Sequence, residues 1–186
     1  MPMKPIVYIF RGAPASGKGT VISEFCKMLP RPIAFISQDV FRWNFHLIGR
    51  SVPEITNDDH ILANKNAEMV FEQYLKNGKY TIVIEGLYTW NDEHSAQGSA
   101  HMLTELAKKY GFRVVNVFLQ ADKEVLLTRN EYRTYSVPLA EFNTLYDNIY
   151  KSIDRSEIII DSTNMSIEAT IDALATIILP TITSVQ

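Results

Sequence analysis

A glycine-rich segment with one lysine stands between an apolar run and an amphipathic run near the start of the chain. It consists of Gly12, Ala13, Pro14, Ala15, Ser16, Gly17, Lys18, Gly19 and Thr20. Gly12 and Gly17 allow a tight turn with its N–H groups pointing inward, and a following helix adds its positive end. Such a nest binds nucleotide phosphates, and Lys18 can reach the β- and γ-phosphate oxygens. A plain connecting turn does not account for a lysine directly after the second glycine.

The hydroxyl that usually follows this lysine stands one position later, at Thr20, because Gly19 comes between. Thr20 is therefore the candidate Mg²⁺ ligand of the loop. The Gly-Lys-Gly-Thr order resembles the loop of adenylate kinases, and the resemblance implies phosphoryl transfer from ATP rather than a GTPase switch. A guanine-reading Asn-Lys-x-Asp motif is also missing, since the Asn64-Lys65 pair has no aspartate two positions later.

A second apolar run, Ile33–Ile36, ends in a stretch that carries Asp39 and Arg42. On a helix that starts at Asp39, these two residues and His46 share one face. Asp39 beyond the carboxyl end of a strand would face the phosphates and accept the proton of an attacking hydroxyl. Arg42 would hold a charged part of the acceptor or the moving phosphoryl group. The alternatives are a helix N-cap for Asp39 and an arginine stacked on an aromatic neighbour for Arg42. We assign His46 a structural role.

Glu85 directly follows the apolar run Tyr80–Ile84. A carboxylate at the carboxyl end of a central strand can hold Mg²⁺ through its waters or orient the acceptor. The alternative is a strand-end glutamate that faces solvent. Because four apolar residues precede it, we favour a central strand and a functional carboxylate.

Arg129 and Arg133 are four residues apart, which would put them on one helical face at the start of the segment 129–138. Two arginines on a mobile lid can close over a triphosphate and neutralise the charge that develops during transfer. The alternative is an ordinary solvated face paired with Glu131 and Asp122.

The order of a kinase-type phosphate loop, then Asp39, two residues and Arg42 looks like the zeta-toxin, polynucleotide-kinase and small-molecule phosphotransferase branch of AAA-type P-loop kinases. The resemblance covers the whole chain loosely. It implies that Asp39 is the acceptor-side base, that Arg42 binds the substrate and that Glu85 belongs to the second acidic motif.

The same resemblance implies that the loop after the last strand passes near the adenine ring, where Thr163 or Asn164 reads its edge. A turn followed by Ser166 as the N-cap of the final helix explains these residues equally well.

Apolar, β-branched runs alternate with amphipathic helical patterns along the whole chain. The predicted strands are Ile6–Phe10, Ile33–Ile36, Tyr80–Ile84, Val114–Leu119 and Ile158–Ile160. The predicted helices are Lys18–Leu29, Asp58–Lys76, Ala100–Lys109, Lys123–Asn130, Leu139–Ser152 and Ile167–Ile178. This alternation predicts a three-layer α/β/α fold with a doubly wound, five-stranded parallel sheet, as in P-loop NTPases.

We expect one domain over residues 1–186, with a substrate loop at 87–99, a lid at 129–138 and a loose tail after Pro180. The single cysteine, Cys26, excludes an internal disulfide, and the N-terminus lacks the pattern of a secretory signal. No apolar run is long enough to span a membrane. These features predict a cytoplasmic protein.

The net charge of −3 comes with no basic run, which makes a nucleic-acid partner less favoured. The sequence therefore predicts an ATP- and Mg²⁺-dependent kinase that acts on a small molecule or nucleotide. One alternative is a polynucleotide 5′-hydroxyl kinase in which Trp43 and Trp90 stack a base, although we favour packing roles for both. Another is a regulatory ATPase that transfers nothing.

Overall fold

The computed structural model describes residues 6–30, 32–46, 55–91 and 95–183. Five parallel strands form one sheet in the order β2-β3-β1-β4-β5. They are β1 (Ile6–Arg11), β2 (Ile33–Ser37), β3 (Thr81–Gly86), β4 (Arg113–Gln120) and β5 (Ile158–Asp161). The order reverses at β1, so the crevice beside its carboxyl end is where such sheets bind ligands.

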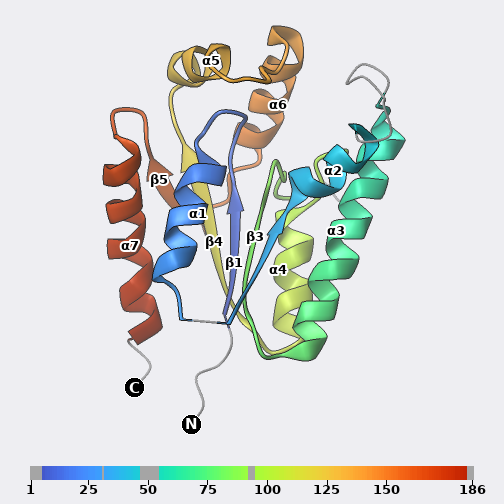
Figure 1. Ribbon diagram of the computed structural model, residues 1–186, viewed down its shortest axis with the longest axis vertical. Coiled ribbons are helices and arrows are strands. Elements are labelled where there is room, and N and C mark those ends of the chain that lie inside the picture. Colours follow the sequence, from blue (N-terminus) through green and yellow to red (C-terminus); the bar gives the residue numbers. More distant parts are fainter. Residues whose placement is uncertain (1–5, 31, 47–54, 92–94, 184–186) are drawn as a thin grey trace.

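Helices cover both faces of this sheet (Figure 1). They are α1 (Lys18–Met28), α2 (Gln38–His46), α3 (Asn57–Asn77), α4 (Ala100–Lys109), α5 (Lys123–Glu131), α6 (Leu139–Lys151) and α7 (Ile167–Thr183). Figure 1 shows α1 and α7 on one side and α3 and α4 on the other, with α5 and α6 beyond the carboxyl ends of the strands.

The central strand β1 is buried along its whole length. Tyr8 and Phe10 belong to the core under α1 and α7, whereas Val7 and Ile9 belong to the core under α3 and α4. Alternate side chains thus serve opposite layers, as expected of a strand buried on both faces. This double burial fixes the end of β1, from which the phosphate loop departs.

The predicted five-stranded, doubly wound parallel sheet is confirmed, and every predicted strand and helix is present within a few residues. One expectation at the end of the chain is wrong, because α7 continues past Pro180 to Thr183. In the described part of the chain, no helix combines the length and apolar character needed to cross a membrane.

The segment 87–99 is held more tightly than the predicted polar loop. Thr89 forms an isolated bridge with Ser99, and its N–H donates to the Gly98 carbonyl at 3.1 Å. Tyr88 and Trp90 are buried in the core under α4, so neither belongs to an exposed polar loop. Its residues 92–94, including His94, lie outside the described residues.

Candidate active site

The phosphate loop has the tight backbone turns that an anion-binding nest requires. Gly12 passes so close to β4 that a Cβ would lie 2.5 Å from the carbonyl oxygen of Leu119. Ala15 and Gly17 have positive φ angles of 62° and 84°, as an anion-binding nest requires. Gly17 is the N-cap of α1 and no side chain caps that helix, so its first N–H groups stay available to a ligand.

Lys18 is only 8% exposed, although it carries an ammonium group. Its Nζ donates to the carbonyl oxygens of Gly12 at 2.8 Å and Ala13 at 2.9 Å, and lies 3.3 Å from Ser16 Oγ. Burial lowers the Lys18 pKa to about 8, against the opposing effect of the Glu85 carboxylate. Among the described residues no carboxylate forms an ion pair with it. The nest therefore holds a cation that lacks an anionic partner.

The other loop residues differ in exposure. Ala13 and Pro14 are buried behind the nest, whereas Gly19 and Thr20 are exposed in the first turn of α1. Among the described residues, the Thr20 side chain forms no hydrogen bond with Lys18 or Glu85.

Asp39 is the second residue of α2 and is exposed. The N-cap residue of α2 precedes Gln38, so Asp39 is not the N-cap and the capping alternative is wrong. No hydrogen bond within the described chain engages the Asp39 carboxylate. The side chain of His46 lies outside the described residues.

Arg42 lies one helical turn further along α2 and is buried. Its Nη2 donates to the carbonyl oxygen of Ala96 at 3.1 Å. The same carbonyl accepts from Asn64 Nδ2 at 2.8 Å, and Gln38 Nε2 donates to the neighbouring carbonyl of Gln97 at 2.6 Å. These bonds tie α2 and α3 to the segment 87–99.

Glu85 comes from the end of β3, where the register places it beside Phe10 on one side and Ser37 on the other. It is buried, and Ser37 Oγ donates to its Oε1. Burial raises the Glu85 pKa, while the positive charge of Lys18 and the Ser37 hydrogen bond oppose that shift. The solvent-facing alternative for Glu85 is therefore wrong.

Four of the predicted residues come together, since Lys18, Asp39, Arg42 and Glu85 lie within electrostatic range of one another. Arg133 joins them, because its charge lowers the Lys18 pKa. Parallel strands put their carboxyl ends at one edge of the sheet, which explains this convergence.

Arg129 and Arg133 do not share a helical face as predicted. The helix α5 ends at Glu131, and Arg133 lies in the exposed turn beyond it. The physical reason is Asn130, whose side chain donates to the carbonyl of Val137 at 2.8 Å and accepts from its N–H at 3.0 Å. These two hydrogen bonds of the Asn130 side chain close the segment 131–136 into a loop.

Arg129 instead contacts the loop after β5. Its Nη2 donates to the carbonyl of Ser162 at 2.8 Å, and its Nη1 lies 3.2 Å from Ser162 Oγ. In that loop, the Thr163 hydroxyl donates to Asp161 at 2.6 Å and accepts from the Asp122 N–H at 2.9 Å. Thr163 is thus committed to the turn. Asn164 is exposed.

The N-cap predicted for the last helix is present, since Ser166 Oγ accepts from the Ala169 N–H at 3.2 Å. The two tryptophans differ from each other. Trp90 is 7% exposed and packs in the core as predicted, but Trp43 is 58% exposed, so the packing role favoured for it is wrong. Its ring meets that of Tyr135 edge-on at 6.5 Å, which brings the segment after α5 against α2.

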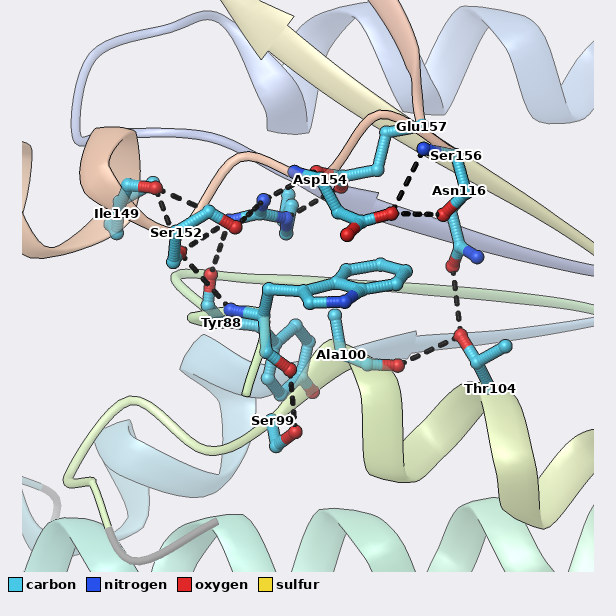
Figure 2. Close-up of polar contacts among 12 residues, drawn as sticks. Tyr88, Ser99, Ala100, Thr104, Asn116, Ile149, Ser152, Asp154, Ser156 and Glu157 are labelled. Atoms are coloured by element: carbon cyan, nitrogen blue, oxygen red, sulfur yellow. Dashed lines mark hydrogen bonds and ion pairs between the residues drawn. The ribbon is translucent and has the colours of Figure 1, made fainter. Parts of the chain in front are cut away.

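Sequence reasoning missed Arg11, which is fully buried at the end of β1. Its guanidinium forms a two-pronged ion pair with Glu157 and stacks 4.8 Å from the ring of Phe118. It also donates to Ser152 and to the carbonyls of Tyr88 and Ile149. Figure 2 shows these partners converging from α6, the segment before β5 and the segment after β3. The only sequence signal was a charge at the end of an apolar strand.

Comparisons with known proteins support the P-loop fold. The family model described as AAA domain matches residues 7–151. A shikimate kinase from Aquifex aeolicus is similar at 19% identity, with 96% of this chain and 99% of that chain covered and a TM-score of 0.60. A gluconokinase from Sinorhizobium meliloti is similar at 16% identity, with 98% of this chain and 99% of that chain covered and a TM-score of 0.60. A thymidylate kinase from Candida albicans is similar at 16% identity, with 96% of this chain and 92% of that chain covered and a TM-score of 0.61.

No sequence among the curated proteins matches the chain significantly. The solved structures are too distant in sequence to show more than a common fold, which is the α/β fold of P-loop kinases. The family model, in contrast, spans most of the chain, and the chain therefore belongs to the AAA domain family.

Proposed function

We propose that the chain transfers the γ-phosphoryl group of ATP, bound with Mg²⁺, to a hydroxyl or phosphate group of a small molecule or nucleotide. The observation that carries this proposal is the buried Lys18 ammonium, which sits in an anion nest next to the charges of Asp39, Arg42 and Glu85. The kinases among the solved structures of the same fold agree with it.

The nest fits the triphosphate. The first turn of α1 has no capping side chain and no acidic residue, so its N–H groups and positive end favour an anion. Among the described residues, Lys18 donates to carbonyl and hydroxyl oxygens of its own loop, which phosphate oxygens would replace as stronger acceptors. The candidates for reading the adenine edge are Thr163, which is held in its turn, and Asn164, which is exposed. Arg129 is a candidate for contacting the triphosphate.

Thr20 and Glu85 would hold the Mg²⁺. Mg²⁺ usually takes one or two protein ligands and completes its shell with phosphate oxygens and water, and a hydroxyl and a carboxylate are oxygen ligands of the kind it prefers. The ion would supply neutralisation of the triphosphate charge.

Asp39 is the proposed base. It is exposed in the first turn of α2, unengaged by hydrogen bonds of the described chain, and close enough for its charge to act on Lys18. Glu85 suits this role less well, because Ser37 already holds one of its oxygens. In the proposed reaction Asp39 accepts the proton of the acceptor hydroxyl, Arg42 binds the acceptor, and Arg133 approaches from the segment after α5.

The Asp39 and Arg42 pair supports the finer proposal that the chain belongs with the zeta-toxin, polynucleotide-kinase and small-molecule phosphotransferase branch. The segments 87–99 and 129–138 are the proposed substrate loop and lid of a single domain. Support for the lid comes from its position beside α2, where Tyr135 meets Trp43.

The test is transfer of labelled γ-phosphate from ATP and Mg²⁺ to a panel of nucleosides, nucleotides, sugars, aminoglycosides, UDP-sugars and small hydroxy acids. Product from one class of acceptor supports the kinase and names its substrate family. ATP binding without transfer to any class would favour the regulatory ATPase instead.

A polynucleotide 5′-hydroxyl kinase is a second candidate, favoured by the exposed pair of Trp43 and Tyr135 on which a base could stack. The net charge of −3 counts against it. Salt-dependent retention on single-stranded DNA, with transfer to a 5′-hydroxyl oligonucleotide, would support it over the small-molecule kinase.

A further inference from the structure

Two buried polar atoms beside the proposed site have no hydrogen-bond partner in the described chain: Arg42 Nε and Tyr88 Oη. Arg42 is 9% exposed and Tyr88 is 1% exposed, so water does not readily replace the missing partners. A buried donor without a partner costs stability, and a charged one costs more. Such exceptions in a folded protein call for an explanation.

Arg42 is oriented but only partly satisfied. Its Nη2 is fixed by the Ala96 carbonyl, and Asn64 holds that carbonyl from α3. The charges of Asp39, Glu85 and Glu141 act on the guanidinium, yet none of these carboxylates forms an ion pair with it. The arrangement keeps the guanidinium in place with its Nε donor uncommitted.

Tyr88 is anchored just as firmly. Tyr88 lies two residues after the end of β3 and packs in the core with Ala100 and Leu103. Its carbonyl accepts from Arg11 Nη1 at 3.3 Å. In Figure 2, Tyr88 lies between Ser152, above it in the view, and Ser99, below it. Burial raises the Tyr88 pKa well above its ordinary value, and the nearby charge of Arg42 opposes that shift. The hydroxyl therefore stays protonated and can donate.

We propose that the phosphoryl acceptor carries an anionic oxygen group, a carboxylate or a phosphate, to which Arg42 Nε and Tyr88 Oη both donate. This inference rests on the proposed function and names the acceptor class of that same site. Two donors need an acceptor of hydrogen bonds, and a buried guanidinium needs a counter-charge. An oxyanion supplies both, because carboxylates and phosphates match the planar donors of arginine.

The chain offers a matched control for Tyr88. Tyr8 also has a buried Oη without a partner in the described residues, but it lies under α1 and α7, in the core on the opposite face of the sheet. Removal of either hydroxyl should leave stability unchanged or raise it, because an unpaired buried group is lost. Only Tyr88→Phe should change acceptor binding.

The experiment is a calorimetric titration of the full chain, saturated with Mg²⁺ and a non-hydrolysable ATP analogue so that the phosphate loop is occupied. The probes are glycerol, glycerate and glycerol 3-phosphate, which share one skeleton and differ in the terminal group. We expect one anionic probe to bind at least about tenfold more tightly than glycerol. Glycerate as the tighter probe identifies a carboxylate, and glycerol 3-phosphate identifies a phosphate.

In Tyr88→Phe, affinity for the preferred anion should fall at least about tenfold, the size expected for a hydrogen bond to a charged group, while Tyr8→Phe keeps it. Equal binding of all three probes, no measurable binding of either anion, or equal affinity in Tyr88→Phe would overturn the proposal. Failure of the proposed function appears separately, as absence of binding of the ATP analogue or of labelled phosphate transfer.

Discussion

Two buried arginines flank the carboxyl edge of the sheet, and they are satisfied very differently. Arg11 pairs with Glu157 through two nitrogens and uses its remaining donors on Ser152 and on main-chain carbonyls. Within the part of the chain that the structure describes, Arg42 donates one hydrogen bond, to Ala96, and its Nε has no partner.

The difference separates structural charge from functional charge. A buried ion pair with all its donors engaged orders the segments around it, as Arg11 orders the end of α6 and the start of the segment 87–99. A buried cation with donors left over is stable only because the rest of the fold compensates for it, and it is the natural partner of a ligand. The two buried glutamates differ in the same way: Glu157 forms an ion pair with Arg11, whereas Glu85 accepts a hydrogen bond from the Ser37 hydroxyl.

Arg11→Met should have the largest effect on stability. It leaves Glu157 buried without its cation, which costs about 3 to 5 kcal/mol of unfolding free energy. Urea unfolding measures this loss. The double variant Arg11→Met/Glu157→Met should recover much of it, and a single-variant loss below about 1 kcal/mol would remove Arg11 from its structural role.

Lys18→Met should abolish binding of ATP but stabilise the nucleotide-free chain by up to about 3 kcal/mol, since one pKa unit corresponds to about 1.4 kcal/mol. The folded pKa of about 8 lies below the ordinary 10.5, so the charge lowers stability fully below pH 8. That penalty disappears as the pH rises to 10.5.

Unfolding of wild type and Lys18→Met at pH 7 and pH 10 measures this difference, which should shrink at pH 10. Lys27→Met is the control, because Lys27 is exposed and forms a surface ion pair with Glu24. A Lys18→Met variant that is less stable than wild type at pH 7 would contradict the burial penalty.

Arg42→Met should change stability by less than about 1 kcal/mol, in contrast to Arg11→Met, because it loses one hydrogen bond and one orphaned donor together. With the acceptor found in the transfer panel, KM should rise about 10- to 100-fold while ATP affinity is kept. An unfolding loss comparable to that of Arg11→Met would end the distinction between the two arginines.

Ser37→Ala should lower stability by about 1 kcal/mol, because it removes one hydrogen bond to the Glu85 carboxylate. Since Ser37 orients a proposed metal ligand, the Mg²⁺ concentration for half-maximal transfer should rise about tenfold. Thermal unfolding measures the stability loss, and a Mg²⁺ titration of transfer measures the Mg²⁺ requirement. An unchanged Mg²⁺ requirement would contradict the role of Glu85 as a metal ligand.

Local sequence patterns were sufficient for much of this molecule. The β-branched runs and helical periodicities predicted the sheet, and the rule that parallel strands end at one edge brought Asp39, Glu85 and Lys18 together in advance. The prediction that Arg129 and Arg133 share a helical face failed because the Asn130 side chain forms two hydrogen bonds with Val137, and the helix ends before Arg133.

Contacts across long sequence separations were beyond such patterns. Arg11 and Glu157 are 146 residues apart, and nothing local marks either as half of an ion pair. The exposure of Trp43 and the buried hydroxyl of Tyr88 also depend on tertiary packing. Two of these features, the exposure of Trp43 and the buried hydroxyl of Tyr88, belong to the proposed acceptor side of this chain.

The most direct test of the account compares Asp39→Asn with wild type for both ATP affinity and transfer of labelled phosphate to the identified acceptor. The substitution keeps the shape of the side chain and removes its ability to accept a proton. The account predicts nearly unchanged ATP affinity and a transfer rate lower by about 10²- to 10⁴-fold. Transfer at the wild-type rate would contradict it.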